Sequence, residues 1–220
     1  RFADHPVDAG IAREVRQAAR NFADMGCVVD ESPPVAWAEE VNELWPAYSA
    51  SGLAWMIEHA WRFPEFVVPE GERPDIARCG DAARASIELG RATHGTRMFA
   101  ALAAIRALAR RMDEMFARYD AILTPSAAAL PWPVPHSHPS HIDGRAVGPR
   151  GHAVFSAFAN AAGLPAIAVP TGFVDGLPTG LQLVGARGRD AALLALALRY
   201  EQAFPREAKW PALADTMPAT

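Results

Sequence analysis

The sequence is most informative at Asn160-Ala-Ala-Gly-Leu-Pro-Ala-Ile-Ala-Val-Pro-Thr-Gly-Phe-Val-Asp-Gly-Leu-Pro-Thr-Gly-Leu-Gln-Leu-Val-Gly185. Gly163 suits the left-handed position just past a helix C-terminus, and Pro165 prevents that helix from continuing. Residues 166–169 and 181–184 are short apolar runs bounded by Gly and Pro, which predicts two strands covered on both faces. Residues 171–180 are rich in Gly and Pro and are predicted to form a loop that can bring backbone close to a ligand.

The N-terminal third of the chain has helical periodicity. Residues 7–26 carry apolar side chains at three- and four-residue spacing, so they are predicted to form a helix capped by Asp8 and ended by Gly26. Residues 27–29 are predicted to form a strand, and residues 35–61 a helix interrupted at Pro46. The four tryptophans of residues 35–61 could line an aromatic pocket, but the favoured interpretation is helix packing; they are Trp37, Trp45, Trp55 and Trp61.

The middle of the chain is predicted to be a loop followed by a long helix. Three prolines and two glycines in residues 64–80 indicate the loop. Residues 81–118 are predicted to be helical, with Gly90 and Gly95 as weak points. The core-facing stripe of this helix is expected to contain Met98, Leu102, Ile105, Ala109, Met112, Phe116 and Tyr119.

Residues 130–150 are the least regular segment. They hold four prolines from Pro131 to Pro139, two glycines and three histidines, and long irregular loops within a compact domain are often functional. The imidazoles at alternate positions and a nearby carboxylate could meet one divalent ion; they belong to His136, His138, His141 and Asp143. No cysteine joins them and Pro139 restricts how they converge, so the favoured interpretation is a polar loop, with no metal and no cofactor.

Composition sets the class of the molecule. The 220 residues are 50% hydrophobic and 21% charged, which is ordinary for a folded domain, and the net charge of −4 gives no indication of nucleic-acid or anionic-membrane binding. No apolar run approaches the ~18–20 residues needed to span a bilayer. Cys27 and Cys79 are isolated and form no motif, which predicts reduced thiols in a cytoplasmic protein.

Several motifs, in order along the chain, resemble the C-terminal half of the amidase signature family. They are Asn160…Gly163-Leu-Pro165, Val169-Pro-Thr-Gly172 and Gly176-Leu-Pro-Thr-Gly-Leu-Gln182, preceded by Tyr119-Asp-Ala-Ile-Leu-Thr-Pro125. The resemblance is close over residues 119–204 and one of pattern only over residues 7–118. It implies an α/β fold in which helices flank a mixed sheet, with a strand over residues 119–125 leading to the substrate pocket and a closing helix over residues 193–204.

The resemblance also implies amide hydrolysis by a Ser–Ser–Lys triad and a glycine-rich oxyanion site. This chain has no Gly-Gly-Ser-Ser run, and its only lysine, Lys209, follows every family motif. The pairing Ser49-Ala-Ser51-Gly52 lacks the preceding glycine of a nucleophile elbow. The chain is therefore expected to be the C-terminal portion of a longer amidase, inactive alone, that acts with the missing N-terminal half on a small amide or self-associates without that half.

Within this portion, four regions are expected: a helix–strand unit at 1–34, a helical cover at 35–118, a core with one pocket wall at 119–204, and a tail at 205–220. By resemblance, the pocket candidates are Pro125, Ser126, Phe155, Asn160 and Gln182. Asn160 could instead hold a helix end, and Gln182 could satisfy a buried backbone group. By the same resemblance, residues 130–150 follow the strand that borders the active site and are expected to face the substrate.

Three alternatives stay open from the sequence. The first is a non-enzymatic interaction or regulatory scaffold with an amidase-like fold. The second is a relative of the amidotransferase branch of the family, in which an acidic residue is expected about two turns before the matching Asn160; the stretch His152-Ala-Val-Phe155 lacks one. The third is a small domain that binds a metal through its histidine loop.

Overall fold

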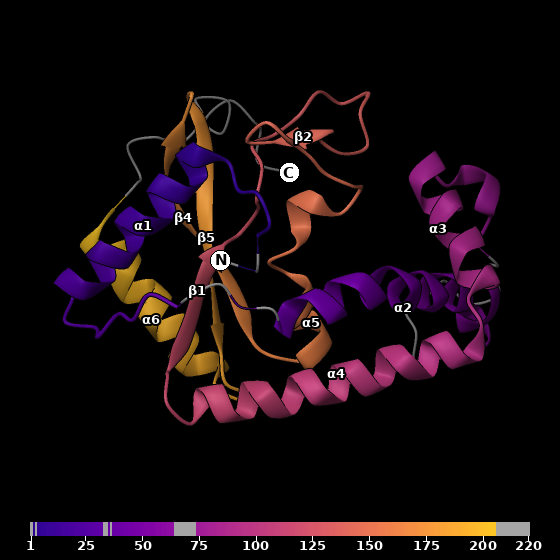
Figure 1. The fold of residues 1–220 in the computed structure, drawn as a ribbon, viewed down its shortest axis with the longest axis horizontal. Helices are drawn as coiled ribbons and strands as arrows, with labels where there is room; N and C mark the ends of the chain where they lie inside the picture. Colours follow the sequence, from indigo (N-terminus) through magenta and orange to yellow (C-terminus); the bar gives the residue numbers. More distant parts are fainter. Residues whose placement is uncertain (1, 3, 33–34, 36, 64–73, 206–220) are drawn as a thin grey trace, which may run out of the picture.

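The computed structural model describes residues 2, 4–32, 35, 37–63 and 74–205. It is an α/β structure in which helices cover both faces of a three-stranded sheet (Figure 1). Helices α1 (Ala9–Asp24) and α6 (Asp190–Ala203) lie on one face, and α5 (Ala157–Ala162), α2 (Trp37–His59) and α4 (Gly95–Phe116) lie on the other. The predicted α/β class is confirmed. Lys209 and the rest of the tail beyond residue 205 lie outside the described residues.

The sheet is built around a long hairpin. Strands β4 (Ala166–Val174) and β5 (Leu177–Gly185) pair antiparallel, and β1 (Ala121–Pro125) pairs antiparallel with the other side of β5. Asp175 and Gly176 form the turn with φ of 51° and 77°, the left-handed conformation that a two-residue hairpin turn requires. The two predicted strands are confirmed, but the loop predicted at 171–180 is wrong, because this turn lets both strands continue through it.

Burial differs between the two strands of the hairpin. Leu181, Leu183 and Val184 of the central strand β5 are at most 2% exposed, which confirms cover on both faces. Ala166 and Ala168 of the edge strand β4 are exposed, so the prediction of cover on both faces is wrong there. Helices α2, α4 and α5 on the same face of the sheet pack against Val184 and leave Ala166 and Ala168 uncovered. All strand pairs of this sheet are antiparallel, so the parallel component of a mixed sheet is absent from its described strands.

Helix α1 begins as predicted. The Asp8 side chain accepts hydrogen bonds from the Gly10 and Ile11 N–H groups at 2.8 and 3.1 Å, which satisfies donors that the helix itself leaves free. The strand predicted at 27–29 is wrong: these residues join no described strand, and Val28 is 93% exposed. A strand requires a hydrogen-bonded neighbour, and local sequence does not supply one.

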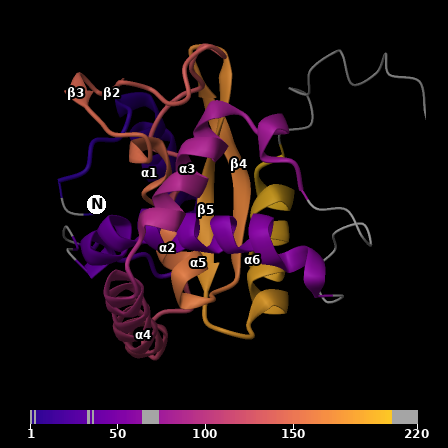
Figure 2. The ribbon, with the colours of Figure 1, turned by 90° about the vertical axis from the view of Figure 1, so that its right-hand side faces the viewer.

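Helices α2, α3 (Asp81–Ala92) and α4 form an arm that extends away from the sheet (Figure 1). In the turned view of Figure 2, α2 and α3 lie in front of the sheet. Short 3₁₀ turns lie at Ala60–Arg62 and Ile76–Arg78, and most of the predicted 64–80 loop lies outside the described residues. The interruption predicted at Pro46 is wrong, because α2 runs through it and is held by buried Ala47, Ala50 and Ala54. Gly90 of α3 permits a close crossing, since a Cβ there would lie 2.1 Å from the Ala50 carbonyl oxygen.

The break between α3 and α4 lies at residues 93–94, between the two predicted weak points. The stripe predicted for the 81–118 helix is confirmed in part: Met112 is buried and Ala109 and Phe116 pack against the core, whereas Leu102 and Tyr119 are exposed. The core side of α4 is formed by small residues and two large ones. This buried face consists of Ala101, Ala104, Leu108 and Met112. Small alanines allow the close approach of α2, a packing requirement that a count of large apolar residues does not capture.

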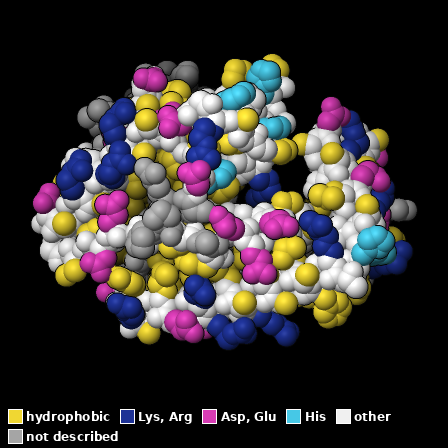
Figure 3. Space-filling view, in the orientation of Figure 1, with side chains coloured by type: hydrophobic (Ala, Val, Ile, Leu, Met, Phe, Trp, Pro, Cys, Tyr) yellow, Lys and Arg dark blue, Asp and Glu magenta, His cyan; other side chains and the backbone are white. Residues whose placement is uncertain are grey.

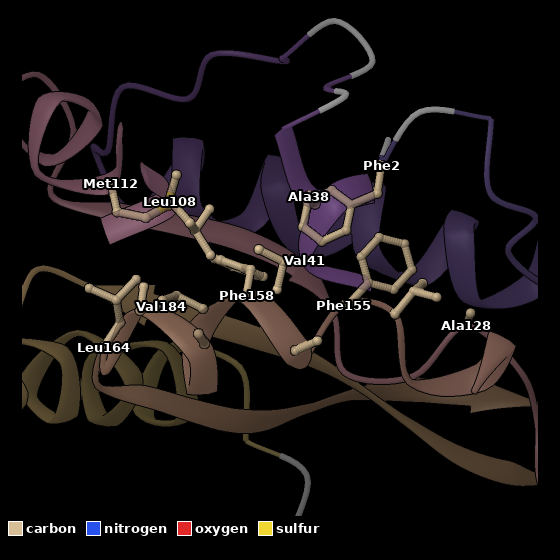
Figure 4. Packing of buried hydrophobic residues seen from close by; sticks show 14 of the residues in the cluster. Phe2, Ala38, Val41, Leu108, Met112, Ala128, Phe155, Phe158, Leu164 and Val184 are labelled. Atoms are coloured by element: carbon tan, nitrogen blue, oxygen red, sulfur yellow. The ribbon is translucent and has the colours of Figure 1, made fainter. Parts of the chain in front are cut away.

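The main core lies between the sheet and the arm (Figure 4). The rings of Phe2, Trp37 and Phe158 meet edge to face at centroid distances of 5.3–5.4 Å, which confirms packing for Trp37. On the opposite face of the sheet, Phe22 of α1 stacks on Tyr200 of α6 at 4.6 Å. No helix in the described part of the chain is long and apolar enough to cross a membrane.

The segment between β1 and α5 carries its own small structure. Strands β2 (His141–Ile142) and β3 (Arg145–Ala146) form a hairpin, and Gly151–Ala153 form a 3₁₀ turn. Ile142 is 3% exposed and joins the main core. Helix α5 then ends at Gly163 with φ of 62°, as predicted, and the Arg187 guanidinium donates to the Ala162 carbonyl at 2.7 Å. The 130–150 segment is thus irregular but anchored.

Candidate functional site

A cleft of about 440 Å³ lies where β1 ends, beside the β4–β5 hairpin and the start of α1. Four parts of the chain meet there: α1, residues 126–132, the 3₁₀ turn after β3, and the N-terminal part of β5. The lining residues are Ile11, Ser126, Ala127, Ala129, Leu130, Pro131, Trp132, His152, Pro178, Thr179 and Gly180.

Backbone hydrogen bonds hold these parts together. The Asp8 N–H donates to the Ala128 carbonyl at 2.8 Å, and the Ala128 N–H donates to the His152 carbonyl at 2.9 Å. His5 adds a contact from its Nε2 atom to the Gly151 carbonyl oxygen at 2.8 Å. Ala128 is fully buried, and its two hydrogen bonds tie the chain on either side of it to the start of α1 and to the 3₁₀ turn. The cleft therefore has fixed walls.

Two hydroxyl groups on the hairpin side of the cleft already form hydrogen bonds within the protein. Both the N–H and the Oγ of Ser126 donate to the Gly180 carbonyl, at 3.1 and 2.9 Å. A Cβ on Gly180 would lie 3.1 Å from this Oγ and 3.1 Å from the Val169 carbonyl oxygen, so the close approach favours glycine. Thr179 Oγ1 lies 3.1 Å from the Gly172 carbonyl oxygen. Ser126 and His152 both line the cleft, but no hydrogen bond between their side chains is found in the described part of the chain.

Another part of the cleft lining is formed by an indole and an imidazole. The rings of Trp132 and His152 lie 4.7 Å apart at an interplanar angle of 54°. The Trp132 Nε1–H donates to the His136 carbonyl at 2.8 Å, which fixes the indole on its own turn. His152 Nδ1 is buried and has no partner among the described residues. Burial first, and then the nearby positive charge of Arg150 and the presence of His138, lower the pKa of His152.

The cleft carries no formal charge. None of the described residues that line it is Asp, Glu, Lys or Arg, and the lowered pKa of His152 favours a neutral imidazole near pH 7. The face of the molecule shown in Figure 3 is different, because acidic and basic side chains are interspersed there. The cleft is thus a local neutral and largely apolar site on a charged molecule.

The structure separates the five residues predicted for the pocket. Ser126 lines the cleft, and Pro125 precedes it as the last residue of β1. Asn160 is exposed at the C-terminal end of α5, where its carbonyl accepts from the Gly163 N–H at 3.2 Å. Phe155 and Gln182 lie in the interior at 3% and 9% exposure and do not line the cleft.

Gln182 belongs to a buried polar network. Its Nε2 donates to the Phe155 carbonyl at 2.8 Å and to Thr124 Oγ1 at 3.1 Å, across the β1–β5 pair. Thr124 is itself only 5% exposed. The side chain therefore satisfies a buried backbone group, which is the structural role that the sequence left open for it.

The histidine loop shows no shared binding geometry. His138 and His141 each lie beside the serine that precedes them, at 2.9 and 3.1 Å. The described residues contain no group of three or more His, Cys, Asp or Glu side chains that could hold a metal ion.

Sequence reasoning missed Trp132 and His152 as individual site residues. Trp132 lies between Pro131 and Pro133 in the predicted substrate-facing segment, and a large aromatic residue held between prolines in a loop was the available signal. His152 lies just past that segment, and only the hydrogen bond between Ala128 and its carbonyl brings it to the cleft. No local pattern could reveal that contact.

Known proteins share both the sequence pattern and this architecture. The family model described as amidase matches residues 2–194. The chain belongs to the amidase family. A glutamyl-tRNA(Gln) amidotransferase subunit of Symbiobacterium thermophilum is 35% identical over 106 residues, covering 48% of this chain and 21% of that relative. The corresponding Thermotoga maritima protein is 25% identical over a 220-residue alignment, covering 92% of this chain and 44% of that relative.

Solved amidase-signature structures have the same fold. A bacterial aryl acylamidase of this family superposes with a TM-score of 0.76 at 24% identity, over 97% of this chain and 44% of that one. The 6-aminohexanoate cyclic dimer hydrolase complexed with substrate gives 0.74 at 23% identity, over 96% and 45%. The chain thus spans less than half the length of the curated relatives and solved structures described above.

Proposed function

We propose that this chain is the substrate-binding portion of an amide hydrolase and that the nucleophile and base come from residues outside these 220. The observation that carries the proposal is the composition of the cleft in a chain of the amidase family: the residues described there form walls for a substrate and include no activated nucleophile. Amide hydrolysis needs a nucleophile beside a base. Ser126 donates to a backbone carbonyl instead.

The length of the relatives supports this division of labour. The matched region is 44% of the Thermotoga maritima relative, so more than half of that protein has no counterpart here. A Ser–Ser–Lys site on such a segment would meet the cleft at the end of β1. The amides acted on would be small molecules that fit within about 440 Å³.

The test uses a serine-reactive fluorophosphonate on two proteins: the 220-residue chain and the full product of the reading frame that contains it. The chain alone should remain unlabelled and should not release ammonia or amine from amides. The full product should be labelled at one serine outside this chain, and full-product Ser126→Ala should keep that labelling. Labelling of Ser126 in the isolated chain would contradict the proposal, and an unlabelled, inactive full product would favour the scaffold alternative.

A role in amidotransfer is the second candidate, because several of the similar proteins are amidotransferase subunits. The cleft argues against an amino-acid substrate, since its described lining has no charged side chain to pair with an α-carboxylate or ammonium group. Glutamine-dependent release of ammonia by the full product, without hydrolysis of uncharged amides, would favour this candidate.

We also propose that the isolated chain associates through its uncovered apolar surface. The outer edge of β4 pairs with no strand in the described part of the chain, and Ala166 and Ala168 beside it are exposed. On α6, Leu194 and Leu198 are 59% and 54% exposed. Open edges and apolar patches promote association. Light scattering should show oligomers of the isolated chain; a monomer at tens of micromolar with a cooperative melt would refute this.

A further inference from the structure

We infer that the cleft selects amides carrying a flat, uncharged group, which would pack against Trp132 and receive a hydrogen bond from His152. The inference rests on the proposed function, because it names the class of substrate for the same cleft. It follows from three observations: the state of the indole, the state of the imidazole, and the lack of charge around them.

The indole of Trp132 can offer only its ring. Its single polar atom, Nε1, already donates to the His136 carbonyl at 2.8 Å. The side chain is half-buried, so part of the ring remains open where it lines the cleft. A ring fixed by its own hydrogen bond loses little conformational freedom when a ligand packs on it, and flat groups make the largest contact with an aromatic surface.

The imidazole of His152 supplies a single directed hydrogen bond. A proton on the buried, unpartnered Nδ1 would be a donor without an acceptor, which is costly, so the neutral ring carries its proton on Nε2. Nε2 is then a donor suited to a carbonyl, ether or ring-nitrogen acceptor. The centroids of the imidazole and the Trp132 indole lie 4.7 Å apart, and this contact orients the imidazole relative to the indole.

The remaining walls favour apolar groups and oppose ions. Ile11, Ala129, Leu130 and Pro178 contribute hydrocarbon, and no lining residue in the described part of the chain carries a charge to pair with an ionic group. Transfer of an unpaired carboxylate or ammonium into such a site is strongly unfavourable. The walls that this chain contributes therefore disfavour zwitterionic amino-acid amides and favour aryl or arylalkyl amides.

The experiment uses the full product of the reading frame and two probes, phenylacetamide and cyclohexylacetamide, which match in size but differ in flatness. Hydrolysis gives kcat/KM, and calorimetric titration with turnover accounted for gives Kd. Phenylacetamide should be preferred. Trp132→Ala should reduce this preference about tenfold, Trp132→Phe should retain most of it, and His152→Phe should weaken binding of both probes about fivefold. Trp55→Ala, at a tryptophan outside the cleft, should leave both probes unaffected.

The two readouts separate failure of the inference from failure of the proposed function. Binding of phenylacetamide that depends on Trp132, without hydrolysis, would support the inference and refute the hydrolase. Hydrolysis with no preference between the probes, or a preference unchanged in Trp132→Ala, would overturn the inference and leave the hydrolase standing. No detectable binding or hydrolysis of phenylacetamide would overturn the inference as well.

Discussion

Two groups of side chains near the end of β1 contrast sharply. Thr124, Phe155 and Gln182 form a buried network in which the Gln182 side chain donates hydrogen bonds to the other two residues. Ser126, Trp132 and His152 line an open cleft a short distance along the chain. Both groups include residues from segments that resemble the amidase signature family. Membership of a family segment therefore does not distinguish a structural residue from a substrate-facing one, whereas burial and hydrogen bonding do.

The energetic consequences of the two groups should differ in kind. A buried group with satisfied hydrogen bonds contributes to the free energy of unfolding, and removing one partner leaves the other unsatisfied. A side chain on a cleft wall has less to lose on truncation, because part of it already faces solvent. Its contribution appears when a ligand binds.

The largest effect should come from Phe155→Ala. The ring is 3% exposed and lies 4.8 Å from that of Phe2, so truncation should lower the free energy of unfolding by about 3–5 kcal/mol. Urea denaturation measures the change, with Trp132→Ala as the comparison in the cleft. A loss of stability in Trp132→Ala as large as that in Phe155→Ala would erase the contrast between the two groups.

Gln182→Leu should have the next largest effect. It removes the donor to the Phe155 carbonyl and to Thr124 Oγ1, so the free energy of unfolding should fall by about 1–3 kcal/mol. The matched control is Gln202→Leu, at an exposed position on α6, where the change should stay within about 0.5 kcal/mol. If Gln182→Leu is as mild as this control, the network does not stabilise the fold.

The same contrast shows what the sequence could predict. The start of α1 was predictable because the Asp8 cap and the residues it caps are neighbours in sequence. The two strands were predictable because their apolar runs, bounded by Gly and Pro, are also local sequence patterns. The absence of a strand at 27–29 and the continuity of α2 through Pro46 depend on distant partners. In the site, Ser126 followed from resemblance, but Trp132 and His152 meet only through the tertiary fold.

A smaller effect should appear in the pH dependence of stability. Burial, then Arg150 and His138, hold the folded-state pKa of His152 below its ordinary value of about 6.5. Below about pH 6.5 the imidazole of His152 binds a proton in the unfolded chain but resists it in the folded chain. The stability that the neutral imidazole contributes is therefore fully present above about pH 6.5 and declines as the pH falls toward the folded-state pKa.

Replacing the imidazole tests this sign. His152→Asn should lose less stability than the parent chain when urea midpoints are compared between pH 7.5 and 5.0, conditions chosen to span about 6.5. A steeper loss in His152→Asn than in the parent would show that protonation of His152 stabilises the folded state.

The central claim is that the cleft, and not the buried network, meets the substrate. The most direct test measures stability and selectivity on the same two variants of the full product. The variants are Trp132→Ala and Phe155→Leu, and the readouts are Tm and the ratio of kcat/KM for phenylacetamide to that for cyclohexylacetamide. Trp132→Ala should lower the ratio about tenfold with the smaller change in Tm, and Phe155→Leu should lower Tm and leave the ratio unchanged. A ratio that shifts in Phe155→Leu and stays constant in Trp132→Ala would contradict this assignment of the site.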